Sequence, residues 1–218
     1  MMLKVFKTLR SCSRHLLYLE AGVVPARYQV MRQMMNFLQY ILMQPPNSLL
    51  HRFYQAQLKN PNKGDWASEA KQIANHLNIH LSNEEIQNMK RTQFKYMVKN
   101  RVEEAAFKYL ITKQQSGKKG KQIKYEKLQM SDYLLAESEA TLEEKFHIFA
   151  LRTEMNDLPH NFGRSALCKY GCQEDMSNNH IFNCQNPQEG AFEMLLNGNV
   201  KEKVKAKNMF QTNLTSFF

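Results

Sequence analysis

Three of the four cysteines in this chain lie close together in the sequence and share that window with a histidine. The spacing C-x3-C-x7-H-x3-C is formed by Cys168, Cys172, His180 and Cys184. Thiolates and imidazole at such short spacings are the ligands of structural zinc sites, in which the protein fills all four coordination positions. The first pair can lie on a tight turn, and the second pair can share one face of a short helix. We therefore expect a zinc knuckle with one structural Zn²⁺; the alternative is three buried thiols beside a surface histidine.

The rest of the sequence has apolar residues at helical spacing and little strand-like alternation. We expect a mainly α fold, in which a helical domain is followed by the small C-terminal knuckle. The longest helix should run from about Thr92 to Gln115. Ser82 with Glu85, and Thr141 with Glu144, have the spacing of capping boxes. No run of 18 apolar residues occurs, so no membrane-spanning helix and no membrane partner are predicted.

Positive charge is concentrated in one part of the chain. Between Lys90 and Lys127 there are twelve lysines and arginines against three glutamates, a balance of +9 within a total of +10. Clustered cations release counterions when they neutralise phosphates, so this segment predicts contacts with RNA or DNA. The alternative is a solvated helix face followed by a flexible loop. The predicted contacts are Lys95, Lys99, Arg101, Lys108, Lys113, Lys118, Lys119, Lys121 and Lys124, joined by Lys169 and Tyr170 at the knuckle.

Tyrosines lie between these cations and have two possible uses. Tyr96 and Tyr109 can stack on exposed bases, as aromatic residues do in proteins that bind single strands. Their helical spacing favours packing in the core, which is the use we expect. Tyr170 follows Lys169 in the knuckle turn and is the better candidate for stacking.

The usual local signatures of catalysis are missing from the sequence. It has no glycine-rich phosphate loop, no HExxH and no GxSxG motif. A Cys3His site leaves no open position on zinc for an activated water. We therefore expect a binding protein and not an enzyme.

The cysteines also bear on the compartment. Cys12 has no evident partner, and no disulfide framework is apparent, so we expect a reducing compartment, nuclear or cytoplasmic. The first nineteen residues carry four cations and no acidic residue, which superficially resembles a mitochondrial presequence. A basic amphipathic helix that continues a larger parent protein is the interpretation we favour.

Several stretches, in collinear order from about residue 15 to 186, resemble the region after the reverse transcriptase domain of non-LTR (LINE-type) retrotransposon polyproteins. The resemblance is strongest to the Dong-like group, which has a restriction-like endonuclease. The stretches are LEAGVVPARYQVMRQMMNFLQYIL (19–42), KNPNKGDW (59–66), KNRVEEAAFKYL (99–110), IKYEKLQMSDYL (123–134), FALRTEMNDLPHNF (149–162) and the knuckle ending HIFNC (180–184).

The resemblance implies a linker that positions template RNA and target DNA beside a parent-type polymerase. It assigns the metal ligands of the family to Cys168, Cys172, His180 and Cys184. Family members commonly have C-x2-C at the first pair, where this chain has C-x3-C. The acidic YxDD-type motif of the polymerase and the acidic and lysine core of the endonuclease are absent.

We expect four segments along the chain. These are thumb-like linker helices over 1–45, a basic helical linker domain over 46–160, the knuckle over 161–187, and partly ordered helices over 188–218. Together the residues and the resemblance predict a zinc-binding, nucleic-acid-binding fragment without catalytic activity of its own. The alternative is a zinc-stapled helical scaffold for protein interaction, domesticated or vestigial.

Overall fold

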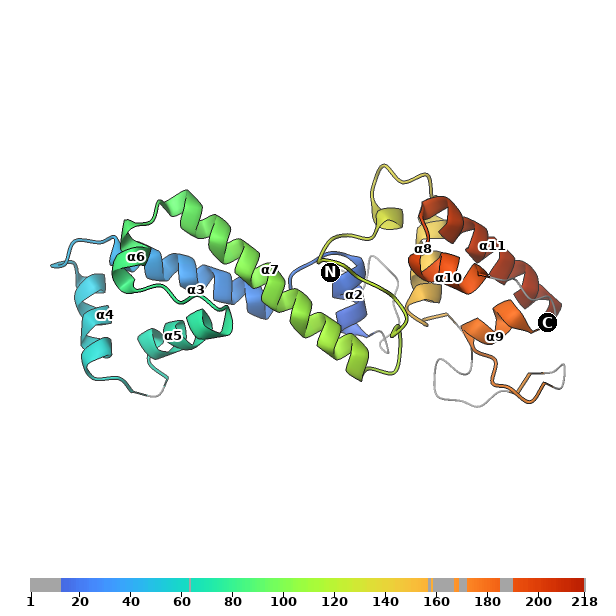
Figure 1. Ribbon diagram of the computed structural model, residues 1–218, viewed down its shortest axis with the longest axis horizontal. Coiled ribbons are helices and arrows are strands. Elements are labelled where there is room, and N and C mark those ends of the chain that lie inside the picture. The colour runs from blue at the N-terminus through green and yellow to red at the C-terminus, as the bar shows by residue number, and fades with distance from the viewer. Residues whose placement is uncertain are drawn as a thin grey trace. The chain divides into compact units, whose positions relative to one another are not determined.

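A computed structural model describes residues 13–62, 64–156, 158, 167–168, 172–184 and 190–217 (Figure 1). These residues form ten α-helices and one short 3-10 helix. Within this part of the chain, extended pairing is limited to two isolated bridges, Ala21 with Met130 and Leu167 with Asp175. The predicted mainly α fold is confirmed. Every helix in the described ranges is too short or too polar to span a bilayer.

The structure divides into two compact units. One unit consists of residues 24–109, and the other of the residues before 24 and after 109. Helix α7 (Arg91–Ser116) contributes residues to both. The division of the chain into four consecutive segments, expected from the sequence, stays a prediction.

The unit of residues 24–109 is built from α3, α4, α5, α6 and the first part of α7. The helix bounds are Ala26–Leu42 for α3, Leu49–Lys59 for α4, Trp66–His76 for α5 and Asn83–Asn88 for α6. Within this unit, Met35, Phe94 and Val98 are fully buried. The side-chain amide of Gln39 donates to the carbonyls of Ile86 and Met89 at 3.2 and 3.0 Å. This amide thereby satisfies carbonyls at the end of α6 that have no partner within the helix.

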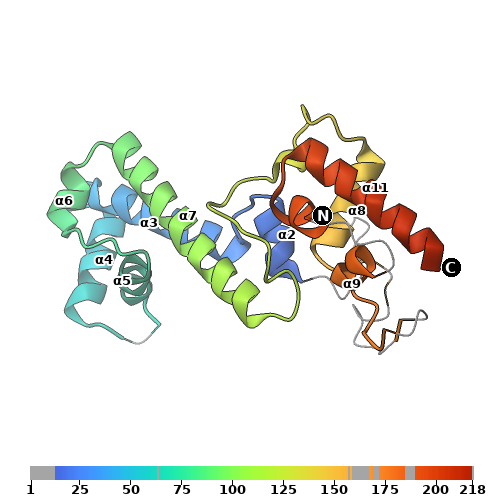
Figure 2. The same cartoon turned by 45° about the vertical axis from the view of Figure 1, so that its right-hand side comes forward.

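The second unit contains the remaining helices. They are α2 (Arg14–Glu20), the end of α7, the 3-10 helix η1 (Asp132–Leu134), α8 (Leu142–Arg152), α9 (Asn178–Asn183), α10 (Ala191–Asn197) and α11 (Val200–Phe217). Helix α11 lies alongside α8, α9 and α10 in both views (Figure 1, Figure 2). Phe149, Phe182 and Phe210 fill the core between these helices. Their burial fixes α9, the helix that carries part of the Cys/His cluster.

The local predictions for helices agree closely with the structure. Helix α7 extends one residue beyond each predicted end. Both capping boxes are formed, because the Ser82 and Thr141 hydroxyls accept from the N–H groups of Glu85 and Glu144, and each glutamate carboxylate accepts in return. These hydrogen bonds join residues three apart, which is why sequence spacing could predict them.

The prediction that Tyr96 packs in the core is wrong, whereas Tyr109 does make internal contacts. Tyr96 is 67% exposed, because it lies on the side of α7 opposite Phe94 and Val98. The Tyr109 ring lies 5.9 Å from the Tyr28 ring, and the Arg27 guanidinium lies 4.9 Å from the Tyr109 centroid. Local sequence alone did not separate these two tyrosines, because both follow the dipeptide Phe-Lys and precede two apolar residues.

A buried polar network joins distant parts of the second unit. The Arg152 guanidinium donates to Glu20 Oε1 from Nε at 3.0 Å and from Nη2 at 2.9 Å. The hydroxyls of Tyr125 and Tyr133 donate to the two oxygens of the same carboxylate at 2.6 and 2.7 Å. Arg152 also donates to the carbonyls of Leu195 and Leu196 at the end of α10. Every member of this network has a partner, as buried charges require.

Candidate metal centre

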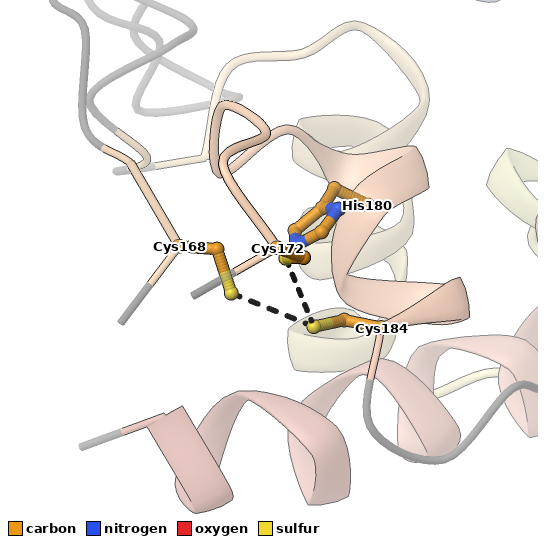
Figure 3. A group of neighbouring side chains, drawn as sticks. All are labelled: Cys168, Cys172, His180 and Cys184. Atoms are coloured by element: carbon orange, nitrogen blue, oxygen red, sulfur yellow. Dashed lines mark hydrogen bonds between the residues drawn. The ribbon is translucent and has the colours of Figure 1, made fainter. Parts of the chain in front are cut away.

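The four predicted ligands converge at one point of the second unit (Figure 3). Their donor atoms all lie within 4.8 Å of one another. Cys184 Sγ lies 3.5 Å from Cys168 Sγ and 3.7 Å from Cys172 Sγ, and His180 Nε2 lies 3.2 Å from Cys172 Sγ. Bonds of about 2.3 Å at tetrahedral angles place sulfur ligands about 3.8 Å apart. The two sulfur–sulfur distances are close to this value, and the group can hold a metal ion.

Local structure brings the ligands together from two directions. Ser177 caps α9, and its hydroxyl accepts from the N–H of His180 at 3.1 Å in the first helical turn. The next two residues, Ile181 and Phe182, are fully buried in the core. The helix ends at Asn183, so Cys184 is its C-cap and not a residue within it. The expected closeness of His180 and Cys184 is present, although it arises at a helix end.

The other two ligands come from the segment before α9. Cys168 is buried, and its N–H donates to the carbonyl of Glu174 at 2.9 Å. Cys172 is exposed and Cys184 is partly exposed. Residues 169–171, between these two cysteines, lie outside the described residues. They include Lys169 and Tyr170, which the sequence predicts as nucleic-acid contacts.

The electrostatics of the cluster favour a bound cation. Burial, together with hydrogen bonds and charge interactions with Cys168 and Cys172, raises the pKa of the Cys184 thiol to about 12. Burial alone would lower the pKa of His180, but interactions with Cys168 and Glu174 raise it above its usual range. Three thiolates at this separation need compensating positive charge, and a divalent ion supplies it while the thiol protons leave.

A carboxylate beside the cluster was not predicted from the sequence. Glu174 Oε2 lies 2.9 Å from His180 Nδ1, the ring nitrogen that faces away from Cys172. A histidine that binds a metal through one nitrogen usually donates its other N–H to a carboxylate or a carbonyl. The acidic residue six positions before the histidine was the available signal, but nothing local distinguishes it from Asp175.

The twelve cations between Lys90 and Lys127 divide equally between the two units. Six of them belong to the unit of residues 24–109, and all six are exposed. These are Lys90, Arg91, Lys95, Lys99, Arg101 and Lys108. Lys99 with Glu103 at 3.8 Å and Arg101 with Glu104 at 3.2 Å form exposed ion pairs along α7. Exposed pairs of this kind are worth about 0.3–0.5 kcal/mol and do not prevent contact with a phosphate.

The other six cations are Lys113, Lys118, Lys119, Lys121, Lys124 and Lys127. The loop that carries most of them is held in place by the buried amide of Gln114, which donates to the carbonyls of Gly120 and Ile123 at 2.6 and 2.9 Å. Lys119 Nζ donates to the carbonyl of Glu154 at 3.0 Å, so this predicted phosphate contact is also used inside the protein. Lys118, Lys121 and Lys124 are exposed.

The protein therefore has a group of four donors that can hold a metal ion, and it has exposed cations on both units. Sequence spacing identified the four donors, and only the folded structure revealed the carboxylate beside them. No family model, curated protein or solved structure matches this chain.

Proposed function

We propose that this protein is a zinc-binding, nucleic-acid-binding module without catalytic activity of its own. The observation that carries the proposal is the convergence of three thiols and one imidazole within 4.8 Å. Soft sulfur donors with one imidazole, in tetrahedral arrangement, suit Zn²⁺ better than Mg²⁺ or Ca²⁺, which prefer oxygen ligands. Because the protein supplies all four ligands, the role of the metal is structural. It would tie the segment around Cys168 and Cys172 to α9.

Exposed cations support the nucleic-acid part of the proposal. Lys95, Lys99 and Arg101 lie on α7 in one unit, and Lys118, Lys121 and Lys124 lie on the anchored loop in the other. Each phosphate that such a side chain neutralises releases condensed counterions, whatever the base sequence. The exposed ring of Tyr96, next to Lys95, is available to stack on an unpaired base.

The resemblance to the region after a LINE-type reverse transcriptase domain supports the same function. That region positions RNA and target DNA, and the resembling stretches occur in the same order here. We propose that the chain derives from such a polyprotein and binds RNA or DNA through the phosphates, with a parent-type polymerase as a further partner.

Neutralising one group of cations tests the proposal. We expect the triple variant Lys95→Gln, Lys99→Gln, Arg101→Gln to bind a fluorescent RNA hairpin or DNA duplex at least about tenfold more weakly at low salt. The slope of log affinity against log salt should fall by roughly 1 for each phosphate that the variant no longer neutralises. Fluorescence anisotropy between about 50 and 200 mM salt measures both quantities.

The matched control removes the same charge elsewhere. Lys59, Lys71 and Lys205 are exposed cations outside the 90–127 segment, and their replacement by glutamine should weaken binding much less. Equal weakening in both triple variants would show that net charge alone, and not this surface, attracts the nucleic acid. A wild-type protein that binds neither probe at low salt would refute the nucleic-acid function.

One feature favours a second candidate, a helical scaffold that binds another protein. Helix α4 buries only Tyr54, whereas Leu49 is 82% and Phe53 is 60% exposed. These two side chains are four residues apart and lie on one face, which is typical of a helix that packs against a partner. A scaffold would bind nucleic acid weakly, and its wild-type form would show no steep dependence on salt.

A further inference from the structure

Glu174 contacts two of the candidate metal ligands. Its carboxylate Oε2 lies 2.9 Å from His180 Nδ1, while the other ring nitrogen, Nε2, lies 3.2 Å from Cys172 Sγ. The histidine side chain is only 6% exposed, whereas the carboxylate is 72% exposed. The carboxylate therefore reaches the ring from the solvent side and is not one of the four converging donors.

The main chain of Glu174 contacts a second of the candidate metal ligands, Cys168. The carbonyl of Glu174 accepts from the N–H of Cys168 at 2.9 Å. The adjacent bridge between Leu167 and Asp175 holds the two segments side by side. Residue 174 thus contacts Cys168 through its backbone and His180 through its side chain, and it follows Cys172 by two positions.

We infer that Glu174 is a positioning residue of the metal centre, an inference that rests on the proposed zinc site. A carboxylate at Nδ1 selects the tautomer in which Nδ1 carries the proton and Nε2 is free to bind the metal. It also limits rotation of the ring, so Nε2 points toward the sulfur atoms before the ion arrives. A negative charge beyond the ligand makes the imidazole a stronger donor.

The interaction is not explained as an ordinary surface ion pair. Such pairs contribute little, since both partners are hydrated and mobile. Here one partner is buried and has a second nitrogen directed at the cluster. The carboxylate therefore determines which atom the ring presents to the metal, whatever it adds to the stability of the fold.

The test measures zinc affinity of the full chain by competition with a chromophoric chelator. We expect Glu174→Ala to bind Zn²⁺ about 10 to 100-fold more weakly than the wild type. Glu174→Gln keeps an oxygen acceptor without the charge and should weaken binding less. Glu137→Ala, which removes an exposed carboxylate elsewhere in the same unit, should leave the affinity unchanged. The alanine variant retains the carbonyl that accepts from Cys168, so the backbone hydrogen bond persists.

A second readout separates positioning from folding. In the zinc-loaded wild type, long-range ¹H–¹⁵N spectra should show His180 protonated at Nδ1, with a proton that exchanges slowly with water. In Glu174→Ala this proton should exchange rapidly. Equal affinity and an equally protected proton in the variant would overturn the inference and leave the zinc site intact. A wild type that binds no zinc would overturn both.

Discussion

Replacing Arg152 by methionine is expected to lower the free energy of unfolding of the second unit by about 3–5 kcal/mol, because it leaves a buried carboxylate without its cation. Glu20 and Arg152 are almost completely buried, and their side chains meet at 2.9 Å. The same change removes the donors to the carbonyls of Leu195 and Leu196. Urea denaturation followed by far-ultraviolet circular dichroism measures the decrease.

The matched control is Arg14→Met, the same substitution at an exposed arginine of the same unit. It should change the free energy of unfolding by no more than about 0.5 kcal/mol. A double variant, Glu20→Gln with Arg152→Met, should recover part of the stability, since no buried charge then remains unpaired. Equal effects of Arg14→Met and Arg152→Met would show that the network contributes little.

The same network predicts how stability depends on pH. Burial alone would raise the pKa of Glu20, but Arg152 and the hydroxyls of Tyr125 and Tyr133 outweigh it and hold this pKa below its usual range. A depressed pKa stabilises the folded state above the pKa of the unfolded chain, and the benefit is lost as the pH falls through the folded value. In Arg152→Met the pKa of Glu20 should instead rise. The difference in free energy of unfolding between this variant and the wild type should therefore become smaller toward acid pH.

The second large effect is expected on removing the metal. We expect the wild type to carry one equivalent of zinc, and Cys184→Ser to carry essentially none, because a structural site requires all four ligands. Binding of zinc is worth about 10–16 kcal/mol in isolated finger peptides, where it drives folding. Here Ile181 and Phe182 also pack in an apolar core with Phe149 and Phe210, so metal removal should loosen the segment and not unfold the whole unit.

Native mass spectrometry gives the number of zinc ions per chain. Hydrogen exchange shows which segment becomes less ordered when the metal is removed. A chelator should increase exchange in peptides that cover residues 172–184 and leave peptides from residues 24–109 unchanged. Cys12→Ser is the control, because it removes the one cysteine outside the cluster and should keep the zinc. A wild type that folds without zinc and exchanges equally with and without chelator would refute the metal centre.

Features that depend on short sequence distances were predictable. The four donors were identified from spacing alone, because a metal site with short loops constrains residues four to eight positions apart. The helix α7 and both capping boxes followed from helical periodicity and from hydrogen bonds between residues three apart. In each case the physical interaction is local, so the pattern of residues nearly specifies it.

Features that depend on distant residues were decided by the tertiary structure. Arg152 binds Glu20 across 132 positions, and no local pattern marks either residue as buried. Tyr96 and Tyr109 have similar sequence surroundings, yet one is exposed and the other meets Tyr28 and Arg27. The sequence by itself determined the helices and the candidate ligands of the metal. Which polar groups lose their water, and must therefore find partners such as Arg152 for Glu20 or Glu174 for His180, depends on how the helices pack.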